Sequence, residues 1–187
     1  MKQWQQIAMR DSKLESPKEI CGLVVNVKGK EVFFYCPNRS RDKDNFILDP
    51  DSYAACEEKG QIVGIFHSHP KGSSEPSDAD KISCEASKLP WHIYSPLENT
   101  WSELKPNGYK PKLYGRPWIW GLTDCYTFLR DWYKEVKNIN LKDYERSLTA
   151  EEFLEDPLFE SYAWRTGFRE LRHNESFEKG DVFLMKL

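Results

Sequence analysis

The sequence predicts an α/β fold for roughly the first hundred residues, followed by a smaller second unit. Short apolar runs bounded by turn residues alternate with segments of helical periodicity. One of these runs leads directly into two histidines, and the composition changes after residue 104. A chain of 187 residues is long enough for one sizeable domain or two small ones, so both units are feasible.

The elements of the first half follow from periodicity, capping residues and turn signals. Helices are predicted at about 3–14, 49–59 and 77–87, the last with Ser77 as a suitable N-cap. Strands are predicted from apolar runs at 20–25, 32–36, 61–66, 91–95 and 100–104. The turn signal Lys28-Gly29-Lys30 joins the first two strands. Residues 1–104 therefore form the first predicted domain.

The second half begins with a basic segment rich in proline and glycine, which predicts a linker over 105–117. A helix is predicted over about 124–136 from its regularly spaced aromatic and aliphatic side chains. For residues from about 138 to 178, the sequence pattern indicates only short helices and loops. The second predicted domain spans 118–187.

Composition narrows the class of protein. The hydrophobic and charged shares, 39% and 30%, are typical of a soluble globular chain, and the formal net charge of −3 argues against non-specific nucleic-acid binding. No run approaches the roughly 18 apolar residues of a membrane span, and the N-terminus does not resemble a secretory signal. Five irregularly spaced cysteines do not suggest a disulfide framework, so we expect synthesis in the reducing cytosol.

Three candidate metal ligands occur in one short window, His67, His69 and Asp80. Residues i and i+2 of a strand point to the same face, so both imidazoles can bind one ion. Three protein ligands leave one tetrahedral position open for water, which is the arrangement of catalytic zinc. Glu19, just before the first strand, is the candidate carboxylate for moving protons.

These residues resemble the motif of the JAMM (MPN-plus) metallopeptidases: a Glu, then His-x-His-Pro, then Ser-x-x-Asp. The resemblance covers about residues 1–104 and implies a JAMM/MPN-like, cytidine-deaminase-like mixed sheet flanked by helices. It also implies that His67, His69 and Asp80 bind Zn²⁺, that Glu19 is the general acid/base, and that Ser77 helps stabilise the oxyanion. Such enzymes hydrolyse peptide or isopeptide bonds, and deubiquitinating enzymes are among them.

Taken singly, each residue of this motif has a structural explanation. A lone His-x-His pair is usually coincidental, and Glu19 alone is a surface charge. Ser77 alone is a helix cap, and Asp80 in a first helical turn is explained by the helix dipole. The order and spacing of all of them together favour zinc.

Cys125 is placed by the sequence at the start of the second-half helix, where the helix N-terminus is expected to lower its pKa. Thr123-Asp124-Cys125 and Gly180-Asp181 resemble the NlpC-type cysteine peptidases, which cut peptidoglycan peptides. This implies the N-terminal part of an α+β papain-like domain. His173 precedes the Gly-Asp segment, so it does not match the catalytic histidine of that family, and we expect this site to be inactive here.

A JAMM unit followed by an NlpC-type unit resembles the tail-tip assembly proteins of lambda-like siphophages. The resemblance implies other tail-tip proteins as partners, peptidoglycan or a tail protein as substrate, and a location in the host cytoplasm during assembly or at the virion tail tip. Three alternatives remain open: an assembly factor with a non-catalytic zinc site, a cysteine endopeptidase whose histidine belongs to a longer chain, and ubiquitin-type deconjugation.

Overall fold

The computed structural model describes residues 1–40, 45–147, 152 and 163–183. The chain divides into two compact units, Met1–Pro111 and Lys112–Leu187, here called unit 1 and unit 2. The division falls inside the segment for which the sequence predicts a linker.

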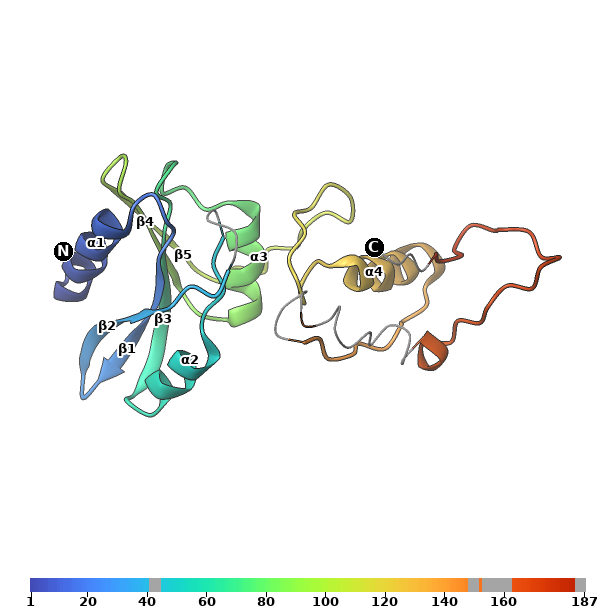
Figure 1. The fold of residues 1–187 in the computed structure, drawn as a ribbon, viewed down its shortest axis with the longest axis horizontal. Helices are drawn as coiled ribbons and strands as arrows, with labels where there is room; N and C mark the ends of the chain where they lie inside the picture. The colour runs from blue at the N-terminus through green and yellow to red at the C-terminus, as the bar shows by residue number, and fades with distance from the viewer. Residues whose placement is uncertain (41–44, 148–151, 153–162, 184–187) are drawn as a thin grey trace. The chain divides into compact units, whose positions relative to one another are not determined.

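Unit 1 is a five-stranded mixed sheet between helices (Figure 1). Its strands are β1 (Cys21–Val27), β2 (Lys30–Cys36), β3 (Gln61–Ser68), β4 (Trp91–Ser95) and β5 (Thr100–Leu104), in the spatial order β2-β1-β3-β4-β5. The β3–β4 pair is parallel and the other pairs are antiparallel. The mixed α/β sheet predicted for this half is therefore confirmed.

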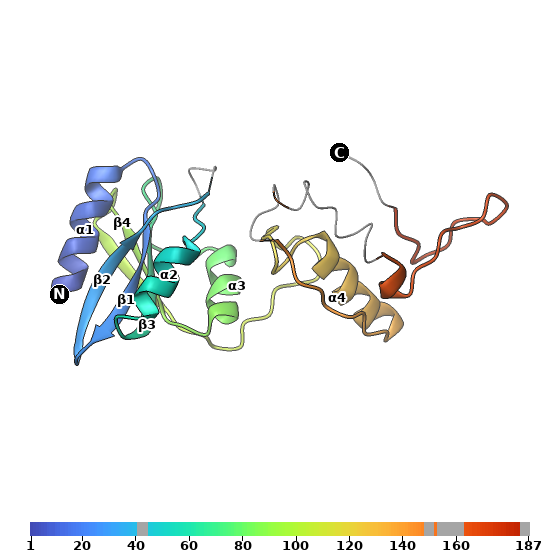
Figure 2. The ribbon, with the colours of Figure 1, turned by 60° about the horizontal axis from the view of Figure 1, so that its bottom comes forward.

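Three helices cover the two faces of this sheet: α1 (Gln3–Glu15), α2 (Pro50–Glu57) and α3 (Asp78–Ser87). Figure 2 shows α1 on one side of the strands and α2 and α3 on the other. All eight predicted elements of unit 1 are present, with ends within about two residues of those expected. Local periodicity and capping therefore suffice to locate them.

Two apolar clusters fill the space on either side of the sheet. β1 supplies both, because alternate residues of a strand face opposite sides. Under α1, the buried members are Trp4, Ala8, Ile20, Val24, Phe33, Phe66 and Tyr94. Under α2 and α3, they are Cys21, Leu23, Val25, Cys36, Cys56, Ile65, Cys84 and Trp91. The four cysteines of unit 1 are thus buried, reduced and part of the core, as expected from small apolar side chains.

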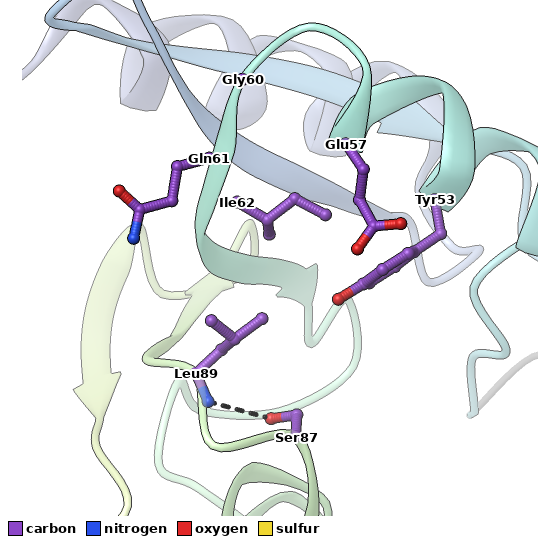
Figure 3. A pocket seen from close by; sticks show the side chains of 7 residues that line it. All are labelled: Tyr53, Glu57, Gly60, Gln61, Ile62, Ser87 and Leu89. Atoms are coloured by element: carbon purple, nitrogen blue, oxygen red, sulfur yellow. Dashed lines mark hydrogen bonds between the residues drawn. The ribbon is translucent and has the colours of Figure 1, made fainter.

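A pocket of about 370 Å³ lies in unit 1 where β3 begins. Tyr53 and Glu57 of α2 line it together with residues at the start of β3 and at the end of α3 (Figure 3). Ser87 accepts a hydrogen bond from the backbone of Leu89 on its wall. The two predicted histidine ligands lie at the opposite end of β3, so this pocket is a separate feature.

Unit 2 contains helix α4 (Cys125–Lys137) and a short 3₁₀ helix, η1 (Ala163–Thr166). The predicted second-half helix is confirmed. Residues 181–183, in the segment that resembles the NlpC type, form no strand, and Leu184 lies outside the described residues. Val182 and Phe183 are exposed and have no neighbouring strand among the described residues of unit 2, so no ladder forms there. Within the described parts, no helix is long and apolar enough to cross a membrane.

Candidate metal centre

The end of β3 delivers the two histidines. His67 is the second-last residue of the strand and is fully buried, and His69 follows the strand directly. Cys21 pairs with His67 across β1 and β3, so Glu19, two residues before β1, lies beside the histidines. Asp80 comes from the first turn of α3, which follows the loop after His69. The fold therefore brings together four side chains from three segments.

The donor atoms of these side chains are close. The Nε2 atoms of His67 and His69 lie 3.0 Å apart. Asp80 places Oδ1 3.1 Å from Nε2 of His67 and Oδ2 3.4 Å from Nε2 of His69. Oε1 of Glu19 lies 3.8 Å from Nε2 of His67. Glu19, His67 and His69 are also close enough together to share one metal ion.

This donor set fits zinc. Two nitrogens bound to one tetrahedral zinc at roughly 2.0–2.1 Å would lie about 3.3 Å apart, close to the observed separation of the two imidazoles. Nδ1 of His69 donates to the carbonyl oxygen of Ser73 at 2.9 Å, because a carbonyl can only accept. Neutral His69 therefore has its lone pair on Nε2, facing the centre. A backbone carbonyl on the outer ring nitrogen is typical of zinc-binding histidines.

His67 is held differently. Its Nδ1 is buried and has no hydrogen-bond partner among the described residues. Instead, Phe46 stacks on the imidazole at 4.8 Å and Trp91 meets it edge-on at 5.3 Å, so aromatic packing orients the ring. Burial lowers the pKa of His67, although hydrogen bonding to Asp80 opposes this. The neutral form required of a metal ligand is thus favoured.

The charges of Asp80 and His69 are coupled. Burial by itself would raise the pKa of Asp80, but hydrogen bonds from His67 and His69 outweigh it and hold the pKa well below its usual range. For His69, burial would lower the pKa, but the hydrogen bond to Asp80 and that to Ser73 raise it. Asp80 is therefore a carboxylate, the form that binds a cation.

Ser77 is the N-cap of α3. Its hydroxyl accepts from the Asp80 amide at 3.1 Å and donates to Oδ2 of Asp80 at 2.7 Å, and its own amide donates to the same oxygen. This reciprocal capping box confirms the predicted cap. The hydroxyl proton of Ser77 thus points at a carboxylate, and oxyanion stabilisation by this residue stays a prediction.

Sequence reasoning did not identify some residues that support this centre. Nδ2 of Asn38 donates to the carbonyl oxygen of Glu19 at 3.2 Å and to that of Asn45 at 2.9 Å. Phe46, Asn38 and Ser73 lie in loops, where side-chain or carbonyl direction is set by tertiary contacts. Their sequence signal is weak because no periodic pattern governs such positions.

Cys125 belongs to unit 2 and is not part of this centre. It is the first residue of α4, the position that the sequence predicts, and it is exposed. The expectation that its pKa is lowered is wrong: partial burial of the thiol, followed by the negative charge of Asp124, raises the pKa. The helix N-terminus is already occupied, because Asp124 accepts from the Thr127 amide at 2.8 Å.

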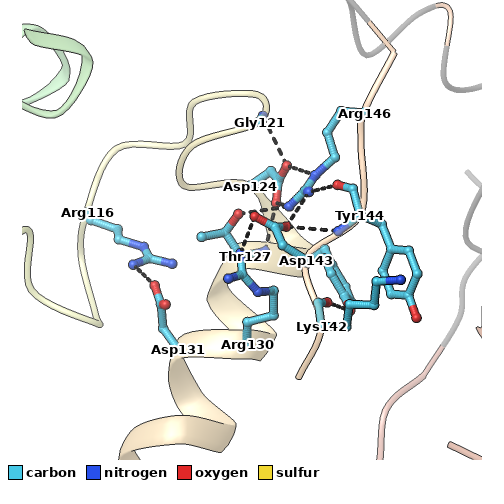
Figure 4. A network of polar contacts seen from close by, with 11 residues as sticks. Arg116, Gly121, Asp124, Thr127, Arg130, Asp131, Lys142, Asp143, Tyr144 and Arg146 are labelled. Carbon is cyan, nitrogen blue, oxygen red and sulfur yellow. Dashed lines mark hydrogen bonds and ion pairs between the residues drawn. The ribbon is translucent and has the colours of Figure 1, made fainter. Parts of the chain in front are cut away.

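Asp124 is the centre of a polar network in unit 2 (Figure 4). Its carboxylate is 1% exposed and accepts from the Gly121 amide at 3.0 Å and from Nε of Arg146 at 2.9 Å. Arg146 also donates to Thr127 and covers the ring of Tyr126. The hydrogen bond from Arg146 and that from Thr127 lower the pKa of Asp124 against the effect of burial.

The sequence comparison identifies the family of unit 1. The prokaryotic homologs of the JAB domain match residues 1–106. The chain belongs to this family. It is also 34% identical to the tail tip assembly protein K of Escherichia phage N15 over 181 residues, which cover 96% of this chain and 73% of that protein. The phage lambda protein of the same name is 34% identical over 103 residues, 53% of this chain and 47% of that protein.

The chain is also similar to solved structures, at lower sequence identity than to the phage proteins. A protein from Desulfitobacterium hafniense is 21% identical, with a TM-score of 0.47, over 55% of this chain and 78% of that one. A JAB1/MPN domain protein from Archaeoglobus fulgidus is 19% identical, with a TM-score of 0.37, over 57% and 86% of the two chains. The chain spans about half the length of the lambda relative.

Proposed function

We propose that this chain acts in phage tail tip assembly and that its JAB domain is a zinc-dependent peptidase. The convergence of His67, His69, Asp80 and Glu19 carries the proposal, because three ligands and one further carboxylate meet at the end of β3. Relatives named for tail tip assembly support the biological setting. Its partners are then other tail-tip proteins, met in the host cytoplasm during assembly or at the virion tail tip.

In this proposal His67, His69 and Asp80 hold Zn²⁺, and Glu19 moves protons. Zinc, when bound, polarises a carbonyl group and makes water more acidic. Glu19 is 7% exposed, and its Oε1 lies 3.8 Å from a ligand nitrogen, so it can take a proton from an attacking water and deliver it to the leaving amine. The substrate is a peptide or isopeptide bond, in a peptidoglycan peptide or a tail protein.

Metal analysis and two substitutions test the mechanism. Purified protein is expected to hold about one zinc per chain, Glu19→Gln to keep the zinc and lose hydrolysis by at least about 100-fold, and His67→Ala to lose the zinc. Glu57→Gln, at the separate pocket, is the matched control. Muropeptides and purified tail proteins serve as substrates. A Glu19→Gln protein that cleaves as fast as the parent would end the proposal.

A non-catalytic zinc site is the second candidate, favoured by one observation: the Ser77 hydroxyl donates to Asp80. In that case His67→Ala impairs tail assembly, whereas Glu19→Gln assembles tails normally and the parent hydrolyses nothing. The two candidates therefore differ in the behaviour of the same two variants.

We propose that unit 2 is the N-terminal part of an NlpC-type domain. Support comes from the capped helix α4 and from the exposed Cys125 at its first residue. The raised pKa of Cys125 favours the protonated thiol, which is a poor nucleophile, so we expect this site to be inactive by itself. An activity in a longer polypeptide would need a histidine that removes this proton.

A further inference from the structure

Ser68, the residue between the two histidines, is one of the few completely buried polar residues of unit 1. Alternation along β3 directs its side chain away from the face that carries His67. It is therefore not a candidate ligand. Its hydrogen bonds instead lead to the segment that carries Glu19.

The β1–β3 ladder ends at the Cys21–His67 pair, and Ser68 forms the next rung in an unusual way. The Ser68 amide donates to the carbonyl oxygen of Ile20 at 3.0 Å. In return, the Ile20 amide donates at 3.0 Å to the hydroxyl oxygen of Ser68. A side-chain oxygen thus takes the place of the backbone acceptor, which allows the chain to leave the sheet at His69 while β1 stays attached.

The Ile20 amide shares its peptide bond with the Glu19 carbonyl. That carbonyl oxygen accepts from Nδ2 of Asn38 at 3.2 Å, so the Glu19–Ile20 peptide plane is held at both ends. Because the peptide bond is planar, fixing both ends fixes the rotation of the whole unit. The Cα atom of Glu19 lies in that plane, so the plane anchors the point at which the Glu19 side chain leaves the backbone.

We propose that Ser68 is a positioning residue that aims Glu19 at the metal centre, with Asn38 as the second arm of this clamp. The inference rests on the proposed role of Glu19 as the group that moves protons. The ligands have supports of their own: the His69 amide donates to Tyr94 at 2.9 Å, and Asp80 is held by Ser77. Removing the Ser68 hydroxyl therefore loosens Glu19 and leaves zinc binding in place.

The first test is amide hydrogen exchange by NMR on the metal-free full chain. Ser68→Ala is expected to speed exchange of the Ile20 amide at least tenfold. The exchange rates of the Leu23 and Val25 amides should stay within twofold of those in the parent. Ser68→Thr should restore the protection of the Ile20 amide. Ser12→Ala is the control, because it removes another buried hydroxyl, which donates a hydrogen bond to the carbonyl oxygen of Ala8 in α1. Unchanged exchange at Ile20, or a uniform rise along β1, overturns the clamp.

The second test follows zinc addition. Ser68→Ala is expected to bind zinc within threefold of the parent. When zinc is added, the change in the ¹³C chemical shift of the Glu19 carboxyl should be at most half as large in Ser68→Ala as in the parent. Ser68→Thr should recover the change seen in the parent. An equal shift in parent and Ser68→Ala refutes the positioning role. A parent that takes up no zinc refutes the proposed function instead, and the exchange measurement still decides whether the clamp exists.

Discussion

The two units of this chain are stabilised in different ways. Unit 1 buries apolar side chains on both faces of its sheet, in two clusters whose buried members come from β1, β2, β3 and β4 and from all three helices of the unit. In the described part of unit 2, Tyr126 is the one buried hydrophobic residue, and the most buried charged group is Asp124. Hydrophobic burial therefore dominates in unit 1, whereas polar contacts organise unit 2.

The exposed apolar residues reinforce this difference. Those of unit 2 are Tyr114, Trp118, Phe128, Val136, Ile139, Leu171, Phe177, Val182 and Phe183. Helix α4 is strongly amphipathic, yet Phe128 and Val136 on it remain exposed. A helix gains most of its stability from packing its apolar face, so α4 depends on its cap and its ion pairs to an unusual degree.

The largest expected effect is a core deletion in unit 1. Leu23 is fully buried in the cluster under α2 and α3, so Leu23→Ala removes buried methyl groups and leaves a cavity. The expected loss is about 3–4 kcal/mol in the free energy of unfolding of unit 1. Hydrogen exchange with mass spectrometry on the full chain, in increasing urea, measures each unit separately through its own peptides.

The matched substitution in unit 2 is Phe128→Ala. Phe128 is 37% exposed, so its loss should change the stability of unit 2 by less than about 1 kcal/mol. If Phe128→Ala is as damaging as Leu23→Ala, unit 2 has an apolar core and the contrast between the units is wrong.

An effect between those of Leu23→Ala and Phe128→Ala is expected at Asp124. Asp124→Asn keeps a good N-cap but removes the charge that pairs with Arg146, whose side chain is 12% exposed. Breaking a buried ion pair costs roughly 3–5 kcal/mol, and Arg146 retains Asp143 as a partner, so we expect about 2 kcal/mol for unit 2. Exchange of the α4 amides should rise, while that of unit 1 stays unchanged.

The same pair predicts an acid dependence. The pKa of Asp124 is lower in the folded than in the unfolded chain, so its ionised form stabilises the fold above about pH 4. This contribution is lost as the pH falls below about 4, through the folded-state pKa. Unit 2 of the parent should therefore lose stability over that range, and Asp124→Asn should lose less. Equal acid sensitivity of the two proteins would remove Asp124 as the cause.

Sequence reasoning predicts the periodic parts of this molecule well. The elements of unit 1 and the helix α4 follow from apolar spacing and from Ser77 and Asp124 as caps. The proximity of the candidate ligands is also predictable, because His67 and His69 are two residues apart and Asp80 lies in a first helical turn. In these cases the deciding contacts are local in sequence.

The features that the sequence did not predict depend on distant residues. The pKa of Cys125 depends on partial burial and on the engaged carboxylate of Asp124, which Arg146 reaches from 22 positions later. The clamp on Glu19 uses Asn38 and Ser68 from two other segments. Such partners follow from tertiary packing, and no pattern within one segment encodes them.

A further small effect is expected at the two helix caps, which can be compared directly. The side chains of Ser77 and Asp124 each accept a hydrogen bond from the backbone amide three residues later. Helix α3 differs from α4 in that it also buries Ile82 and Cys84 in unit 1. Ser77→Ala should therefore cost only about 1 kcal/mol, the usual cost of a lost cap. Asp80 loses a hydrogen-bond donor at the same time, so zinc affinity should fall about tenfold, as for other residues that support a ligand. Ser77→Thr should recover both quantities in urea unfolding and zinc titration. A Ser77→Ala protein whose α3 exchanges as fast as α4 does in Asp124→Asn would show that the cap, not the core, holds α3.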